Sequence, residues 1–178
     1  GLFLSLKYPG NFGVIIRKTF KSLRITTMET WFRDVCPEDF VSSFHKQESI
    51  CTLRNGSRIL FLGLDDPTKI GSLEAGWIFV DESIELDEKD WIMLVGRLRL
   101  ASVPFRQIFG ATNPDAPTHW LYHRFFVDKM GDVFESSTLD NPYLPQDYKD
   151  RLGQFKGIYY DRYVLGKWVG FEGLVYPD

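Results

Sequence analysis

The chain has 178 residues, a formal net charge of −3 at pH 7 and 44% hydrophobic residues, so it is long and apolar enough to bury a sizeable core. No apolar run approaches the roughly 20 residues that cross a bilayer, and the N-terminus lacks the features of a secretory signal. Cys36 and Cys51 do not form a CxxC motif, which argues against a disulfide framework and a cysteine zinc site. Composition therefore indicates a globular protein of a reducing compartment, without membrane insertion.

The first predicted element is the end of a helix at residues 1–7, where an apolar pattern meets a stop signal at residues 8–10. Gly1 stands in the middle of this pattern, and no methionine precedes it. The chain ends at Asp178 without a charged tail or a capping pattern. We therefore expect an internal piece of a longer protein.

Four apolar runs predict buried strands, because their apolar residues are consecutive rather than alternating, as in strands covered on both faces. These runs are residues 12–19, 58–64, 76–80 and 105–111. Residues 22–35 and 88–98 have helical spacing between them. Strands that alternate with helices predict an α/β fold with a mostly parallel sheet flanked by helices.

Asn55-Gly56 predicts a two-residue hairpin turn, and hence a small antiparallel extension before the second core strand. Aromatic residues at 120–126 predict a short helix, and residues 146–154 predict another. Residues 155–178 are rich in glycine, tyrosine and tryptophan, and we expect them to pack on the sheet as a compact appendage.

The run at residues 76–80 ends in two adjacent carboxylates, Asp81 and Glu82, a pattern typical of nucleotide hydrolysis. Ligands of parallel sheets bind beyond the carboxyl ends of the strands, where these acids are expected. Asp81 would hold Mg²⁺, directly or through water, and Glu82 would orient and deprotonate the water that attacks the γ-phosphate of ATP. The alternative is a strand end followed by solvated acids. The partner motif GxxxxGKS/T is absent from the sequence, so the chain carries half of such a site.

The run at residues 105–111 leads into a second polar pair, Thr112 and Asn113, at a distance from Asp81 that suits one intervening helix. From a neighbouring strand, this pair could hydrogen-bond the γ-phosphate or its water and pass hydrolysis on to a moving element. A strand followed by an Asn-Pro turn is the alternative.

Arg17, Lys18 and Lys21 form a basic cluster after the first predicted strand. Arg17 is therefore a candidate for contact with the nucleotide or with a nucleic-acid backbone. A solvated helix start explains these charges equally well. A second basic window, at residues 97–106, is a further candidate for polyanion contact.

Two other patterns favour structural roles over metal sites. His119 and His123 have helical spacing for zinc, but no glutamate lies between them and no third ligand is evident. The acidic run from Asp81 to Asp90 could assemble two metals for a nuclease, yet such sites usually gather carboxylates from separate strands. A solvated helix start with Asp87 as N-cap is the better interpretation.

Several of these strings together resemble the ATPase domain of the large terminase subunit of tailed bacteriophages, the motor that packages viral DNA into the prohead. The matching strings, in chain order, are VIIRKTFKSLR, WIFVDES, GATNP, TLDNPYLPQDYKDRL and RYVLGKWVGFEGLVYP. They span almost the whole chain, and their order and spacing carry the resemblance. It implies a P-loop NTPase-like fold of the ASCE type, with an ATPase core at residues 1–140 and a C-terminal linker subdomain at residues 141–178.

The resemblance also implies roles for the polar strand ends. Asp81 corresponds to the Walker B acid linked to Mg²⁺, and Glu82 to the catalytic glutamate. Thr112 and Asn113 correspond to the coupling element. These roles agree with those inferred from the residues themselves.

A longer protein with several partners is implied as well. A phosphate-binding loop is expected just upstream of Gly1 and an RNase H-like nuclease domain after Asp178, so the 178-residue chain by itself is expected to be inactive. The implied cofactors are ATP and Mg²⁺. The implied partners are double-stranded DNA, the portal protein, the small terminase subunit and further copies in a ring, in the host cell cytoplasm and without a membrane.

Motors of this kind use an arginine from a neighbouring subunit, and here the sequence departs from the pattern. Residues 65–71 contain one basic side chain, Lys69, which lacks the planar, bidentate geometry of a guanidinium group. Lys69 is the candidate for a weaker version of this contact, unless the arginine lies elsewhere.

Two other functions fit the same residues. Another ATPase with a catalytic glutamate, such as a helicase, would carry a similar Walker B strand and a polar sensor strand. A noncatalytic binding or structural fragment is the alternative from a different class.

Overall fold

The computed structural model describes residues 1–66 and 70–170. The chain divides into two compact units, Gly1–Thr112 (unit 1) and Asn113–Asp178 (unit 2). The expected functional boundary after residue 140 stays a prediction.

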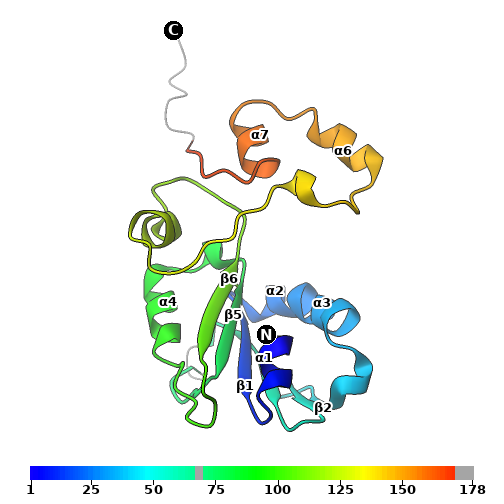
Figure 1. Cartoon of the computed structure of the whole chain (residues 1–178), viewed down its shortest axis with the longest axis vertical. Helices are drawn as coiled ribbons and strands as arrows, with labels where there is room; N and C mark the ends of the chain where they lie inside the picture. Colours follow the sequence, from blue (N-terminus) through cyan, green and yellow to red (C-terminus); the bar gives the residue numbers. More distant parts are fainter. Residues whose placement is uncertain (67–69, 171–178) are drawn as a thin grey trace. The chain divides into compact units, whose positions relative to one another are not determined.

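A six-stranded sheet forms the centre of unit 1 (Figure 1). Its strand order is β2-β3-β4-β1-β5-β6, and the bounds are Phe12–Arg17 (β1), Val41–His45 (β2), Ile50–Leu53 (β3), Arg58–Gly63 (β4), Trp77–Asp81 (β5) and Gln107–Ala111 (β6). Strands β4, β1, β5 and β6 are parallel, whereas β2 and β3 pair antiparallel. The predicted α/β fold with a mostly parallel sheet is confirmed, and β2 is an addition that the sequence did not predict.

Strand β6 differs from the fully buried strand that its apolar run predicts. Its residues are half-buried or exposed, because β6 is the last strand in the order and has one neighbour, β5. In contrast, the inner residues of β1 and all but the first residue of β4 are buried, as predicted.

The hairpin between β3 and β4 has a loop one residue longer than predicted. The amide of Leu53 donates to the carbonyl of Ser57, and the amide of Gly56 donates to the carbonyl of Leu53, so residues 54–56 form the loop. Gly56 has φ +82°, as expected for a type I turn followed by a left-handed residue. Arg54 leaves the hairpin ladder because its amide donates to the carbonyl of Phe40 instead.

The predicted helix at residues 22–35 begins two residues earlier and is broken into three pieces. These are α2 (Phe20–Ile25), α3 (Thr27–Thr30) and a π-helical turn, η1 (Trp31–Val35). Thr19 caps α2 by accepting a hydrogen bond from the amide of Ser22. The break falls at Thr26, whose ψ of −73° departs from regular helical geometry.

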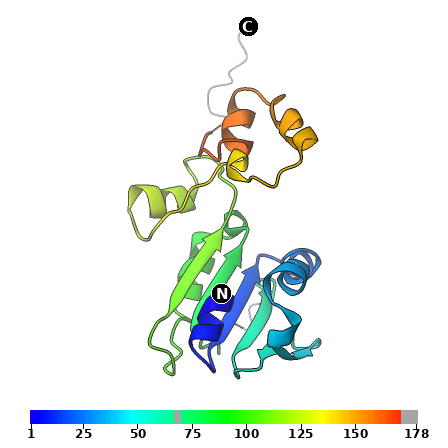
Figure 2. The same ribbon diagram turned by 45° about the vertical axis from the view of Figure 1, so that its right-hand side comes forward.

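The other helical segments of unit 1 agree with the sequence. The predicted helix tail is α1 (Leu2–Lys7), and the predicted helix at residues 88–98 is α4 (Glu88–Val95), with Asp87 at its N-cap. The described residues of unit 1 also include two 3₁₀ turns, η2 (Glu38–Phe40) and η4 (Ser83–Glu85). Helices α2 and α3 lie on one side of the sheet and α4 on the other (Figures 1 and 2).

Trp77 fixes the middle of the sheet. It is fully buried, and it lies opposite Gly13 in the parallel register of β1 and β5. Its indole N–H donates to the hydroxyl of Ser5 at 2.9 Å, which ties α1 to the sheet. The main hydrophobic cluster around it includes Ile15 and Phe61.

Unit 2 consists of short helices and aromatic contacts. Its helical segments are α5 (Trp120–Tyr122), the π-helical turn η5 (His123–Val127), the 3₁₀ turn η6 (Thr138–Asp140), α6 (Gln146–Leu152) and α7 (Ile158–Tyr163). Tyr122 stacks on Phe126 at 5.1 Å between ring centroids, and Trp168 contacts both rings. The predicted helices at 120–126 and 146–154 are confirmed, the second ending at Leu152. The predicted packing of residues 155–178 on the sheet stays a prediction.

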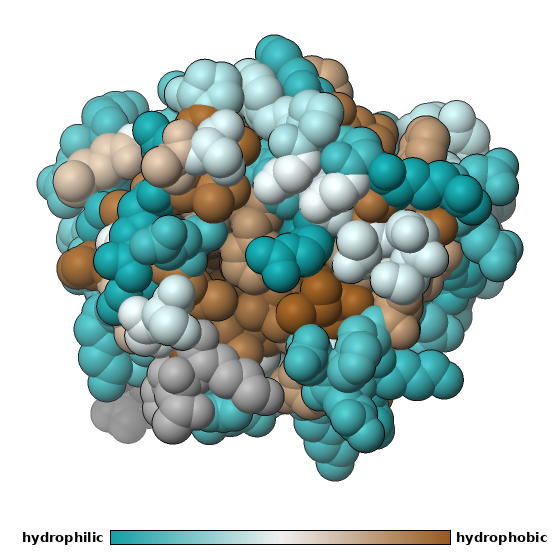
Figure 3. Space-filling view, turned by 90° about the horizontal axis from the view of Figure 1, so that it is seen from below, coloured by the Kyte–Doolittle hydropathy of each residue, from teal (hydrophilic) through white to brown (hydrophobic). Residues whose placement is uncertain are grey.

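One face of the molecule has a hydrophobic hollow. In the view from below, hydrophobic side chains line this hollow and hydrophilic side chains surround it (Figure 3). Among the described residues, no helix is long and apolar enough to cross a membrane.

Substitution of Gly13 by alanine is expected to destabilise the fold, because a Cβ at this position would overlap the indole ring of Trp77. A buried ring has no room to yield, so we expect a loss of about 3 kcal/mol in the free energy of unfolding, measured by urea denaturation. Gly71→Ala is the matched control, since a Cβ there would meet no atom within 4 Å. Equal stability of the two variants would contradict this packing.

Candidate nucleotide site

The two predicted carboxylates lie at the carboxyl end of β5, between the ends of its parallel neighbours. Asp81 is the last residue of β5 and pairs in register with Ala111 of β6. On the other side, β1 ends at Arg17. This is the edge of the sheet where ligands of parallel α/β folds bind.

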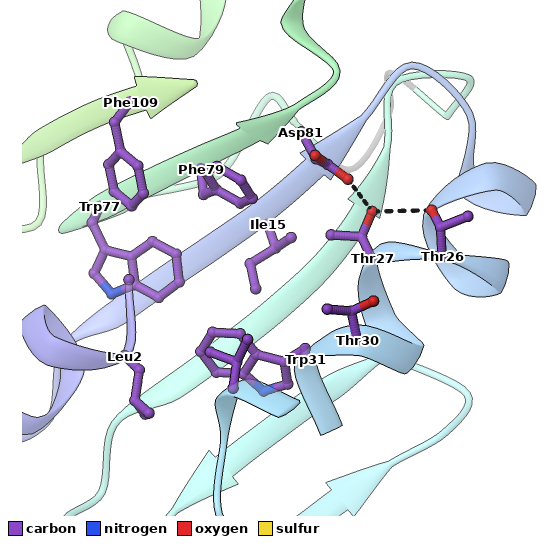
Figure 4. Close-up of a pocket in the computed structure, with 12 residues that line it drawn as sticks. Leu2, Ile15, Thr26, Thr27, Thr30, Trp31, Trp77, Phe79, Asp81 and Phe109 are labelled. Carbon is purple, nitrogen blue, oxygen red and sulfur yellow. Dashed lines mark hydrogen bonds between the residues drawn. The ribbon is translucent and has the colours of Figure 1, made fainter. Parts of the chain in front are cut away.

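Asp81 is held by a hydroxyl from a distant segment. Thr27, the first residue of α3, donates its hydroxyl hydrogen to Oδ2 of Asp81 at 2.5 Å (Figure 4). The length is that of a charge-assisted O–H···O⁻ bond. Sequence reasoning missed Thr27, because nothing in the local pattern of α3 relates it to a strand 54 residues away.

Glu82 has an unusual backbone conformation. Its φ of +50° and ψ of +55° place it in the left-handed region, which non-glycine residues rarely adopt. The bonds around it fix the turn: the Ser83 hydroxyl donates to the carbonyl of Val80 at 3.0 Å, and the amide of Ile84 donates to Oγ1 of Thr112 at 3.1 Å. The chain therefore turns sharply at Glu82, immediately after the strand.

Burial raises the pKa of the Glu82 carboxyl. The negative charge of Asp81 raises it further, whereas the positive charge of Arg17 opposes the shift. Both acids are half-buried. Such a shift brings a carboxylate closer to the range in which it can exchange a proton with water.

Arg17 contacts protein groups rather than open solvent. Its Nη2 lies 3.3 Å from Oε1 of Glu85, and its Nη1 donates to Oγ1 of Thr26 at 2.8 Å. The side chain is 14% exposed. The predicted contact of Arg17 with a nucleotide stays untested, and the two bonds mean that such a contact would have to share or replace them.

Lys18 pairs with the acidic run that follows β5. Its Nζ lies 2.8 Å from Oδ2 of Asp90 and 3.4 Å from Oδ2 of Asp87, and the hydrogen bond to Asp90 raises the pKa of Lys18. Within the described residues, no group of three or more histidine, cysteine or acidic side chains is arranged to hold a metal ion. These carboxylates thus act as ion-pair partners and as the start of α4.

A cavity of about 480 Å³ leads to Asp81. One end is apolar and formed by Leu2, Trp77 and Phe109, and the other is formed by the hydroxyls of α3 and the carboxylate of Asp81 (Figure 4). The α3 hydroxyls are those of Thr27 and Thr30, and the remaining lining residues are Gly1, Ile15, Thr26, Trp31, Val35 and Phe79.

The remaining residues that the sequence singled out do not line this cavity or lie outside the described residues. Thr112 is the last residue of unit 1, and its hydroxyl accepts a hydrogen bond from the amide of Ile84 in the acidic loop, which we define as residues 81–85. Asn113 is the first residue of unit 2. Lys69 lies outside the described residues. Nδ1 of His119 accepts a hydrogen bond from the amide of Leu121, which makes this histidine a helix cap, the structural role favoured above.

The residues at this edge fit a magnesium ion bound with a nucleotide. Mg²⁺ bound to phosphates typically uses one or two carboxylates and keeps several waters, instead of a cage of protein ligands. Asp81 offers one half-buried carboxylate with one oxygen already oriented by Thr27.

The parallel sheet, with its acidic pair at the carboxyl end of β5, has the architecture of the P-loop ATPases. A model of the family described as "Phage terminase large subunit" matches residues 2–167. The chain belongs to the phage terminase large subunit family.

The chain is similar to several characterised relatives. It is 28% identical over 179 residues to the PBSX phage terminase large subunit of Bacillus subtilis (strain 168), covering 86% of this chain and 41% of that protein. It resembles the structure of the large terminase of a thermophilic bacteriophage with a TM-score of 0.76 and 22% identity, over 94% of this chain and 43% of the other. Structures of that terminase have also been solved in complex with ADP and with ATP-γ-S, each with a TM-score of 0.74.

The ATPase domain of the Thermus phage P74-26 large terminase is also similar in fold, with a TM-score of 0.61 and 14% identity over 94% of this chain and 80% of that domain. The chain thus spans about two fifths of the length of its full-length relatives. The predicted family and fold class are confirmed.

The pKa shift of Glu82 predicts a pH-dependent effect of Glu82→Gln on stability. The pKa of Glu82 is higher in the folded state than in the unfolded state, so ionisation of this carboxyl destabilises the folded state at pH values above the unfolded-state pKa. Below that pKa the carboxyl is protonated in both states, and the effect is absent. Glu82→Gln should therefore raise Tm at pH 7 by on the order of 1 °C, with the difference vanishing towards pH 4.

Differential scanning calorimetry at both pH values measures this effect. Glu135→Gln, at an exposed position in unit 2, serves as the control. A Glu82→Gln gain that is equal at pH 4 and pH 7 would exclude titration of this carboxyl as its cause.

Proposed function

We propose that the whole protein is an ATP-driven, Mg²⁺-dependent motor that moves double-stranded DNA into a phage prohead. The observation that carries this proposal is the acidic pair at the end of β5, where Asp81 is oriented by a hydroxyl and Glu82 is fixed in a left-handed turn. Membership of the terminase family supports the choice of DNA packaging among ATP-driven functions.

Asp81 and Glu82 have separate tasks in this mechanism. Asp81 would hold Mg²⁺, directly or through a bound water, and a bound ion would supply electrostatic stabilisation of the phosphate charge. Glu82 orients the attacking water and accepts its proton, for which its raised pKa is suited.

Thr112 and Asn113 form the proposed coupling element. The bond between the Thr112 hydroxyl and the amide of Ile84 supports this role, because it links the acidic loop to the end of β6. A change in the loop on hydrolysis would act on Thr112 directly, and Asn113 follows it in the chain.

The phosphate-binding loop is proposed to precede Gly1. Gly1 and Leu2, at the start of α1, line one end of the cavity, and Asp81 lines the other. A helix that continued upstream from Leu2 along the apolar lining would bring its N-terminus towards Asp81. Helix N-termini bind phosphate through free amides and the helix dipole.

The partners and surroundings of the whole protein follow from the same proposal. It would act with a portal protein and a small terminase subunit as a homo-oligomeric ring in the host cell cytoplasm. Residues 1–140 would be the ATPase core and residues 141–178 the linker to an RNase H-like nuclease. Lys69 is the proposed contact to a neighbouring subunit's nucleotide, unless an arginine elsewhere has this role.

The coding DNA immediately before the codon for Gly1 is expected to encode a GxxxxGKS/T-like pattern. Its spacing should place the glycine-rich turn at the start of the helix that ends as α1. Sequencing this region tests the proposal without any assay, and an intact upstream reading frame without a phosphate loop would contradict it.

In a protein extended to include that loop, Glu82→Gln is expected to lower kcat for ATP hydrolysis at least about 100-fold, because the amide cannot accept the proton of the attacking water. Nucleotide binding, measured by calorimetric titration, should change little. Glu135→Gln is the matched control and should retain full activity. An unchanged rate in Glu82→Gln would show that another residue is the base.

A further inference from the structure

Thr27 bonds the acid at the end of β5, and its own task in metal binding has not been assigned. Its hydroxyl donates to Oδ2 of Asp81, the carboxylate proposed to hold the metal. A hydroxyl has one hydrogen to donate, so this bond orients the Thr27 side chain as well as the carboxylate.

The segment that carries Thr27 is itself firmly placed. Met28 and Trp31, which follow it, are 9% and 6% exposed and belong to the main hydrophobic cluster. Thr26, which precedes it, donates its hydroxyl to the carbonyl of Ser22 at 2.9 Å and accepts from Arg17. The β-branched Thr27 side chain also has few rotamers available. Its hydroxyl is therefore presented to Asp81 from a fixed support.

The junction of α2 and α3 is also connected to the C-terminal end of the acidic loop. Arg17, which bonds Thr26 through one guanidinium nitrogen, contacts Glu85 through the other at 3.3 Å. Asp81 and Glu85 flank Glu82, so both sides of the left-handed turn are connected to the junction of α2 and α3. A strained backbone conformation persists when its surroundings determine it in this way.

We propose that Thr27 is a positioning residue for the metal-linked carboxylate: it engages Oδ2 of Asp81 and so leaves Oδ1 directed to the ion or its water. This inference rests on the proposed function, because it assumes that Asp81 holds Mg²⁺ for ATP hydrolysis. Without the bond, the carboxylate could rotate, and the oxygen presented to the ion would no longer be fixed. Removing partners that orient metal ligands typically weakens metal binding or activity 10–100-fold.

The test uses the full-length protein and two readouts. Binding of Mn²⁺ in the presence of ADP is measured by electron paramagnetic resonance, and the Mg²⁺ concentration for half-maximal ATP hydrolysis is measured separately. Thr27→Val, which removes the hydroxyl at nearly constant shape, is compared with Thr27→Ser, which restores it. Thr118→Val is the matched control, because it makes the same change of side chain at an exposed position in unit 2, outside the cavity.

We expect Thr27→Val to weaken Mn²⁺ binding and to raise the half-maximal Mg²⁺ concentration, each by about 10-fold. Thr27→Ser should lie within about 2-fold of the unsubstituted protein, and Thr118→Val should match the unsubstituted protein. If Thr27→Val does not fold, Thr27→Ala serves in its place, with thermal melting as the check of folding.

The outcomes separate this inference from the proposed function. If the unsubstituted protein hydrolyses ATP and Thr27→Val loses only thermal stability, with an unchanged metal requirement, Thr27 has a structural role and the inference is overturned. If Mn²⁺ binding weakens in Thr27→Val but the unsubstituted full-length protein hydrolyses no ATP, the inference is supported and the proposed function fails.

Discussion

The parallel pairing of β5 with β1 on one side and β6 on the other is the constraint on which the site depends. Because all three strands run in the same direction, their carboxyl ends meet at one edge, and residues far apart in sequence become neighbours there. Arg17 is the last residue of β1, Asp81 is the last residue of β5, and Thr112 directly follows β6. A shift of one residue in the register of β5 would turn Asp81 to the opposite face of the sheet, away from Thr27.

The register is fixed by packing well away from the acids. Trp77 fits beneath Gly13, where no larger residue has room, and its indole N–H bonds Ser5 of α1. Truncation of a buried tryptophan costs about 3–5 kcal/mol, whereas a left-handed non-glycine residue costs about 1–3 kcal/mol. The packing of one side chain is thus large enough to offset the strain at Glu82, provided that the loop is also tied down locally by its hydrogen bonds.

The sequence predicted the elements of the fold better than the contacts of the site. Consecutive apolar residues identified the four parallel strands. In β1 and β4 the reason is burial on both faces, which leaves a direct mark on composition, whereas β6 has such a run although its residues are half-buried or exposed. Strand β2 left no such mark, since its serines and its histidine are exposed and it has antiparallel pairing at the margin of the sheet. The break at Thr26 was equally invisible, because a continuous helical pattern does not reveal where a tertiary contact interrupts it.

The acids themselves could be identified from sequence, since a hydrophobic strand that ends in Asp-Glu is a local pattern. The contacts that surround these acids could not be identified from the sequence. The bond from Thr27 to Asp81 joins residues from separate elements, and Arg17 has its position set by Glu85 and Thr26 rather than by its basic neighbours. A basic cluster therefore indicated charge correctly but gave no partner for that charge.

These contacts also bear on how the acidic loop can affect the rest of the chain. Thr112 bonds the loop through Ile84, and it is at the same time the last residue of unit 1. A displacement of the acidic loop would therefore move Thr112, where the chain leaves the sheet. This movement would not require the hydrophobic core to rearrange. Close-packed cores resist small, continuous deformation, so a path along polar contacts at the strand ends requires less rearrangement than one through Trp77 and its neighbours. In the proposed mechanism, the edge of the sheet that gathers the acids would thus also pass movement along the chain.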